Sequence, residues 1–171
     1  MNDTLDFNDN LLKYMRNACI DNEIAATLAY GIDMNISHVL RDSYFRTTLG
    51  SPLGCIAKAK ITHEHLSNAK PLDSLTDLQH LNFLFLLLIK QLGAKSIIIA
   101  KGVTSVDHDV CKAILAMSPS KLLVVANANR RLFDFVLSST TLKRIVRSPS
   151  LESAIISRFA PMLSYAVGAL P

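Results

Sequence analysis

The sequence predicts an all-α protein with duplicated helix-turn-helix units and a long apolar dimerisation helix. Three observations indicate this class. A twelve-residue pattern occurs twice, apolar side chains in both copies recur at the spacing of one helix face, and a leucine-rich stretch precedes the second copy. The chain of 171 residues is long enough for one domain or two small ones. We expect an N-terminal unit over residues 1–70 and a second unit over residues 75–171.

The first unit centres on "IDNEIAATLAYGIDMNISHVL", residues 20–40, and a helix over 11–18 leads into it. Asp21 suits an N-cap, and Glu23 places negative charge in the first helical turn. Gly31 can end the first helix in a left-handed conformation. Ile36 and Val39 would then pin a second helix, which gives a helix pair around a tight turn.

Between the two units, "LGSPLG", residues 49–54, predicts a turn. "CIAKAKITHEHLS", residues 55–67, alternates in places and predicts a short strand. The apolar helix over 75–93 is expected to pack against a partner, and "KSIIIAKG", residues 95–102, fits either a helix end or a strand. The side chains expected at the oligomer interface are Leu81, Phe83, Leu84, Phe85, Leu87 and Leu88.

The helix pair of the second unit repeats that of the first without gaps at a spacing of 86 residues. "VDHDVCKAILAM" from Val106 matches "IDNEIAATLAYG" from Ile20, so Asp107 corresponds to Asp21. Pro119 stops one helix, and Ser118 or Ser120 can cap the next. A basic segment over 142–147 and a last apolar helix over 151–167 complete the chain.

The net charge of +4 is unevenly distributed. Residues 1–40 hold two basic and six acidic side chains, whereas residues 41–70 hold five and two. Residues 71–111 hold three and four, and residues 112–171 hold eight and two. Each basic block begins within or just after a candidate helix-turn-helix, which is where phosphate contacts are useful.

These blocks supply the candidate DNA-binding residues. A helix-turn-helix presents polar side chains on the open face of its second helix, whereas an ordinary pair of core helices does not need to. Base contacts are expected from Asn35, Ser37 and His38. Phosphate contacts are expected from Arg41, Arg46, Lys58, Lys60, Arg130, Arg131, Lys143, Arg144 and Arg147.

From about Leu78 to Val167 the chain resembles the FlhD subunit of the flagellar master regulator. The matching stretches are "LQHLNFLFLLLIKQLGAKS", "VDHDVCKAILAMSPSKLLVVANAN", "LFDF" and "TTLKRIVRSPSLESAIISRFAPMLS". "IDNEIAATLA" resembles the same helix pair a second time, and "RDSYFRTTLGSPLG" is similar to part of the companion FlhC subunit.

The resemblance implies a transcriptional activator that works with σ factor and RNA polymerase. It would bind double-stranded DNA as a hetero-oligomer with an FlhC-like partner, in flagellar systems or on conjugative elements. This chain departs from the family in two respects. It lacks the zinc-binding cysteine cluster of FlhC-like chains, and it is longer than an FlhD-like chain because of the extra N-terminal unit.

Other chemistry is less well supported by the residues. The sequence has no catalytic motif, so we expect no enzyme and no cofactor. His63 and His65 could ligate one metal from a strand, but no third ligand is evident, so we expect no metal. Three widely spaced cysteines predict free thiols.

The expected location is the cytoplasm. The longest apolar run, residues 81–89, is too short to span a membrane, and acidic residues occupy the place of a signal peptide. Half of the residues are hydrophobic, which predicts self-association. The rival function is a helical adaptor or assembly scaffold that never contacts nucleic acid.

Overall fold

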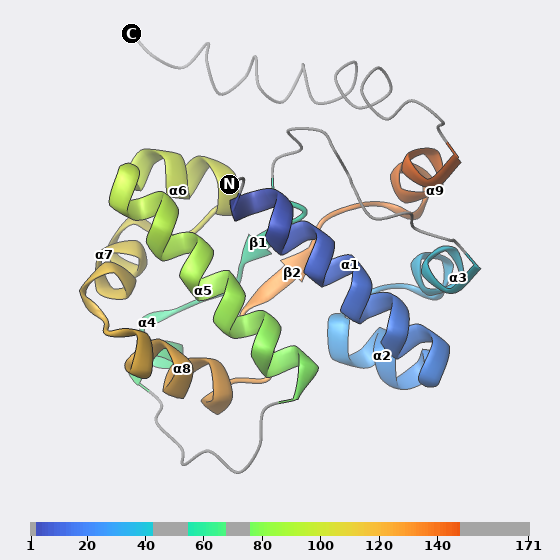
Figure 1. Ribbon diagram of the computed structural model, residues 1–171, viewed down its shortest axis with the longest axis horizontal. Coiled ribbons are helices and arrows are strands. Elements are labelled where there is room, and N and C mark those ends of the chain that lie inside the picture. The colour runs from blue at the N-terminus through green and yellow to red at the C-terminus, as the bar shows by residue number, and fades with distance from the viewer. Residues whose placement is uncertain (1–2, 43–54, 68–75, 148–171) are drawn as a thin grey trace, which may run out of the picture.

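The computed structural model describes residues 3–42, 55–67 and 76–147, and it is mostly helical (Figure 1). The predicted turn over 49–54, the unit boundary over 68–74 and the last helix over 151–167 lie outside this range. The elements are α1 (Asp3–Asp21), α2 (Glu23–Tyr30), α3 (Met34–Asp42), β1 (Ala57–Ala59), α4 (His63–Ser67), α5 (Asp77–Lys95), α6 (Ile97–Thr104), α7 (His108–Ala116), α8 (Pro119–Ala128), β2 (Phe133–Phe135) and α9 (Ser139–Arg147).

Helices α1 and α5 lie side by side at the centre of the molecule (Figure 1). Helices α2, α3 and α9 gather at one end, and α6, α7 and α8 gather at the other. Strands β1 and β2 pair antiparallel, with Lys58 opposite Asp134. One strand comes from each predicted unit, so the two units share a sheet.

Aromatic side chains join the two units in a common core. The ring centroids of Phe7 in α1 and Phe85 in α5 are 5.1 Å apart. Phe133 of β2 meets both rings at steep angles, at 6.0 Å from Phe7 and 5.5 Å from Phe85. All three side chains are buried, and such ring pairs add stability beyond the area that they bury.

Two buried asparagines connect the long helices to the strands. The Asn8 side chain of α1 accepts a hydrogen bond from the Ile56 amide, just before β1, at 3.1 Å. The Asn82 side chain of α5 accepts one from the Leu132 amide, just before β2, at 3.0 Å. Each long helix therefore fixes the start of the strand in its own half of the chain.

The order of elements is similar in the two halves. A long helix, a helix pair, a strand and a further helix occur as α1, α2–α3, β1 and α4, and again as α5, α7–α8, β2 and α9. Helix α6 is additional. The contacts between the halves are reciprocal, because α3 packs against α9 while α8 packs against α4.

The helix ends match the sequence prediction in part. Gly31 ends α2 with φ 61° and ψ 40°, and Asp107 caps α7, as expected. Ser118 caps α8, with Pro119 in its first turn. The predicted N-cap Asp21 is wrong by one residue, because Asp21 ends α1 and the Asn22 side chain accepts the hydrogen bond from the Ala25 amide.

Short elements were harder to predict. The strand expected within residues 55–67 is present as β1, but its second half is helix α4. The stretch over 95–102, open between helix and strand, contributes to α6. Strand β2 was not predicted. Three residues are too few for a periodic pattern, and their partner strand lies 76 residues earlier in the chain.

The apolarity of α5 is largely accounted for by its central position. Leu81, Phe85 and Leu88, all expected at an oligomer interface, are buried within the single chain. They have no surface to offer a partner while the chain is folded, so the assignment is corrected for them. Phe83, Leu84 and Leu87 are half-buried and pack against the same core, which leaves only part of each exposed.

None of the helices in the described ranges combines the length and the apolarity needed to cross a bilayer.

Replacing Asn82 with alanine should lower the free energy of unfolding by about 2 to 4 kcal/mol. The change strands the buried Leu132 amide and removes donors to the Ala126 and Asn129 carbonyls. Urea unfolding followed by circular dichroism measures it. Asn17→Ala, on the exposed surface of α1, is the control and should stay within about 0.5 kcal/mol. Equal effects of the two changes would contradict the role given to Asn82.

Candidate nucleic-acid interface

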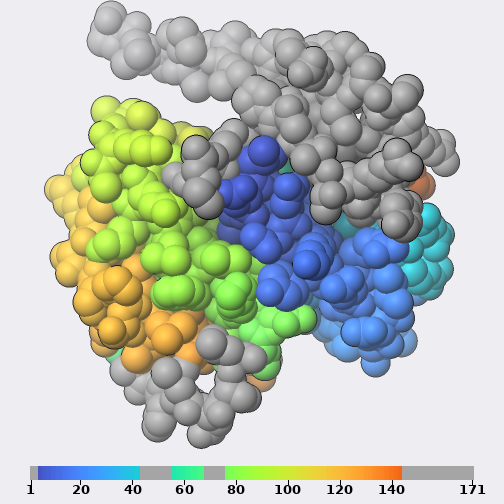
Figure 2. Space-filling view, viewed as in Figure 1, coloured from blue at the N-terminus to red at the C-terminus, as the bar shows by residue number. Residues whose placement is uncertain are grey.

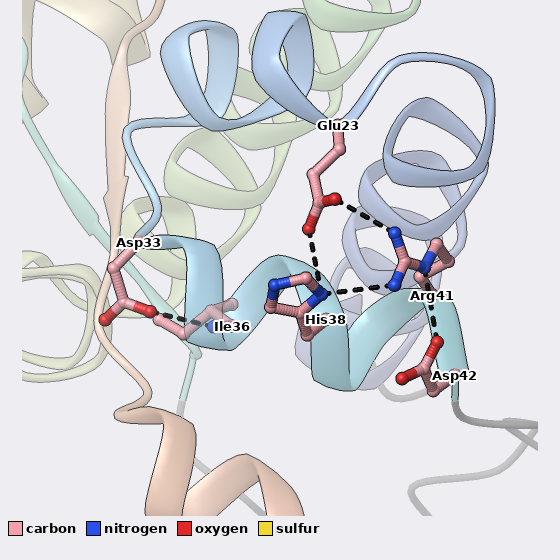
Figure 3. A network of polar contacts seen from close by, with 6 residues as sticks. All are labelled: Glu23, Asp33, Ile36, His38, Arg41 and Asp42. Atoms are coloured by element: carbon pink, nitrogen blue, oxygen red, sulfur yellow. Dashed lines mark hydrogen bonds and ion pairs between the residues drawn. The ribbon is translucent and has the colours of Figure 1, made fainter.

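The candidate base-reading helix is α3, which follows α2 after a tight turn. Asp33 begins it, since its carboxylate accepts a hydrogen bond from the Ile36 amide at 2.8 Å (Figure 3). Ile36 and Val39 are buried, as predicted, and so is Leu40. The helix is therefore pinned by one apolar face and leaves the other open to solvent.

Two of the three expected base-contacting residues lie on the open face. Asn35 and His38 are exposed. Ser37 is fully buried and close to the Cys19 thiol, so its prediction as a base contact is wrong. The error has a simple cause, because Ser37 follows Ile36 directly and turns inward with it toward α1.

An acidic side chain lies beside Arg41 and His38 on the open face. The Glu23 carboxylate lies 2.9 Å from Arg41 Nη1 and 3.3 Å from His38 Nδ1 (Figure 3). Arg41 Nε also donates to Asp42 at 3.2 Å. The hydrogen bond to Asp42, followed by the charge of Glu23, raises the pKa of Arg41. Arg41 is therefore fully charged, but two carboxylates compete with phosphate for it.

The basic helix α9 lies beside α3 (Figure 1). Lys143 in α9 is exposed. The helix also carries Arg144 and Arg147, whose side chains lie outside the described part of the structure. The fold thus brings together a helix of the first basic block and a helix of the second, which the sequence showed only as separate stretches.

The remaining predicted cations do not all lie at the edge formed by α3 and α9. Lys58 is exposed on β1, and Lys60 and Arg130 line a groove beside α2. Arg46 lies outside the described residues. The predicted phosphate contacts are therefore divided between at least two parts of the surface.

Arg131 has a structural role that the sequence did not indicate. Its guanidinium donates to the Ala29 carbonyl at 3.3 Å and to the Asp134 carboxylate at 2.9 Å. It lies so close to Gly31 that a Cβ there would be 2.1 Å from Nη1. A cation at the C-terminus of α2 also opposes the negative end of the helix dipole. The positive charge of Arg131 is therefore paired with groups of the same chain.

Helix α7 receives the same kind of support. Lys90 of α5 donates through Nζ to the Leu115 carbonyl at 2.6 Å, at the C-terminus of α7. The first helix of each pair therefore ends on a basic side chain supplied by another part of the chain.

The histidine pair does not form a metal site in the structure. His63 and His65 belong to α4 rather than to a strand. The His65 ring lies 2.7 Å from the Thr62 hydroxyl and accepts from the Thr62 amide at 3.1 Å, which caps the helix. Across the ranges that the structure covers, no cluster of three potential metal ligands occurs.

The cysteines are free thiols, as predicted. Burial raises the pKa of Cys55 to about 12, against a lowering by the hydrogen bond to the Ala57 backbone. Burial also raises the pKa of Cys19 and of Cys111. A thiol that keeps its proton is a poor nucleophile, so these groups act as small core side chains.

No protein-family model, curated protein or solved structure that we compared with this chain gives a significant match. The likeness to FlhD therefore rests on the local motifs of the sequence.

Two glycines provide a matched test of the α2 C-terminus. Gly31→Ala should destabilise the protein by about 1 to 3 kcal/mol, because alanine resists a positive φ and its methyl group would displace Arg131. Gly102→Ala, in α6 with open space around it, should instead stabilise by about 0.5 to 1 kcal/mol. Thermal unfolding of both variants measures the difference. A Gly31→Ala variant that is as stable as the wild type, or more stable, would show that Arg131 and the turn do not constrain Gly31.

Proposed function

We propose that this chain is a DNA-binding subunit of a transcriptional regulator and that its DNA contact is the edge formed by α3 and α9. One observation carries the proposal. Helix α9 packs beside α3, so exposed Lys143 lies on a helix next to the one that presents Asn35, His38 and Arg41. Polar groups for base edges and cations for phosphates then lie on two neighbouring helices.

The helix pairs α2–α3 and α7–α8 are, in this proposal, two copies of one ancestral unit. The gapless sequence repeat supports it, and so do the matching asparagines Asn8 and Asn82 and the reciprocal contacts of α3 with α9 and α8 with α4. Such a chain carries both halves of a dimer covalently. The second pair is the less suitable DNA reader, because α8 buries Leu122, Val125 and Ala126 and offers few polar groups.

We propose further that a partner subunit contributes contacts to DNA. Glu23 and Asp42 already bind Arg41, so the open face of α3 offers little free positive charge. DNA binding by the chain alone should therefore be weak and sensitive to salt. The resemblance to FlhD points to an FlhC-like protein as the source of the missing contacts, in an activator that works with RNA polymerase.

The alternative is a helical adaptor that never touches DNA. The observation that favours it is the outer face of α2, where Ile24 and Leu28 are 68% and 79% exposed. A large exposed apolar face is typical of protein–protein contact. The two functions differ in whether random duplex DNA binds with a salt dependence.

Charge reversal on α9 tests the DNA contact. Lys143→Glu combined with Arg144→Glu and Arg147→Glu should weaken binding to duplex DNA. It should also flatten the slope of log K against log salt by about 0.9 for each phosphate that the variant no longer neutralises. Fluorescence anisotropy at several salt concentrations measures both quantities, with the chain alone and with its partner.

Lys112→Glu, on α7 at the other end of the molecule, is the control and should leave the slope almost unchanged (Figure 1). If the α9 variant keeps the affinity and slope of the wild type, α9 is not in the interface.

The Glu23 carboxylate should weaken DNA binding. Glu23→Gln removes the charge that pairs with Arg41, so affinity for duplex DNA at low salt should rise by about two- to tenfold. Asp109→Asn makes the same change of net charge in the first turn of α7, away from α3. Equal gains from both variants would mean that only net charge matters and that α3 does not face DNA.

A further inference from the structure

The outer face of α2, formed by Ile24, Ala25, Leu28 and Ala29, is exposed and apolar. All four residues are open to solvent. In the sequence repeat, Ile24, Ala25 and Leu28 correspond to Val110, Cys111 and Ile114 of α7, which are buried. The α7 residues are covered within the chain, where α5 and α6 pack on that helix. The matching face of α2 lacks such a cover, and Figure 2 shows part of this helix at the molecular surface.

A groove of about 740 Å³ runs along this face from Ala25 to the C-terminal end of α2, where Arg131 also lines it. Ala25, Leu28 and Ala29 form one side of it, and Lys60 and Arg130 contribute to the rest. Neither cation has an acidic partner among the residues that the structure describes. The groove is thus apolar along α2 and positively charged beside it.

The residues just before α2 have the complementary features. Ile20, the last large apolar residue of α1, is 51% exposed, and Asp21 beside it is exposed as well. An exposed apolar side chain and a negative charge therefore precede α2, and an apolar groove with two positive charges extends to the C-terminal end of the helix.

We propose that the outer face of α2 is a self-association surface, on which a second copy of this chain docks with its own α2 antiparallel. In that arrangement Ile20 of each copy enters the groove of the other. Asp21 of each copy then faces Lys60 and Arg130 of the other. The two-fold relation forms both contacts twice.

Three physical reasons favour a second copy as the occupant. The charge pattern is self-complementary only when the two helices run antiparallel. Antiparallel helices also place the positive end of one dipole against the negative end of the other. Ala25 and Ala29 have small side chains, which allow the two backbones to approach closely around Ile24 and Leu28.

The interface would be small. Eight residues of helix span about 12 Å, which offers less area than the ~800 Å² per partner of a standard interface. The dimer should therefore dissociate in the micromolar range, and it needs no DNA to form. Its failure would leave the proposed DNA contact at α3 and α9 unaffected.

The first test is the mass of the chain in solution, by sedimentation equilibrium without DNA up to about 200 µM. The wild type should approach twice the mass of one chain. Leu28→Glu should raise the dissociation constant at least about tenfold, because it places a charge in the apolar contact. Ile98→Glu, on α6 with 81% exposure, is the matched control and should dimerise like the wild type.

A wild type that stays monomeric at every concentration would overturn the proposal. So would equal behaviour of the Leu28 and Ile98 variants. Both positions are exposed, so far-UV circular dichroism should match the wild type in each.

A charge swap tests whether the two α2 helices run antiparallel. It also tests the dimer if the Leu28→Glu variant proves misfolded. Asp21→Arg and Arg130→Asp should each weaken the dimer, because each places like charges together at both ends. The double variant should recover most of the wild-type dissociation constant. Single variants without effect, or a double variant as weak as the worse single one, would exclude the antiparallel arrangement.

Discussion

The fold depends on the way each long central helix holds a strand by one buried asparagine. Asn8 and Asn82 accept hydrogen bonds from the backbone amides that precede β1 and β2. The paired strands then bring Phe133 against Phe7 and Phe85. A buried amide without a partner is costly, so these bonds determine where each strand begins. The positions of β1 and β2, and of α9 directly after β2, follow from them.

Local chemistry made part of this predictable. Gly31, Asp107 and Ser118 act within a few residues, so their roles follow from sequence. The contacts between residues far apart in the sequence could not be predicted in this way. Periodicity shows that α5 buries most of its surface but not what covers it, and a count of cations does not reveal that Arg131 contacts Ala29, 102 residues away. The Glu23 contact with Arg41 needs the turn between α2 and α3 before it can be seen.

The candidate site shows why charge blocks overstate a DNA-binding surface. Arg131 is used at the end of α2, Arg41 is shared by two carboxylates, and Lys60 and Arg130 lie beside an apolar groove. Fewer cations therefore remain for phosphate contacts at the α3–α9 edge than the sequence suggested. Such a surface suits a subunit that binds DNA within a larger assembly better than one that binds alone.

Hydrogen–deuterium exchange of the chain, with and without duplex DNA at low salt, tests the central claim most directly. If α3 and α9 form the DNA contact, DNA should slow exchange in these two helices and leave α7 and α8 unchanged. Protection that falls on α7 and α8 instead, or no protection anywhere under conditions where DNA is bound by an added partner, would contradict it.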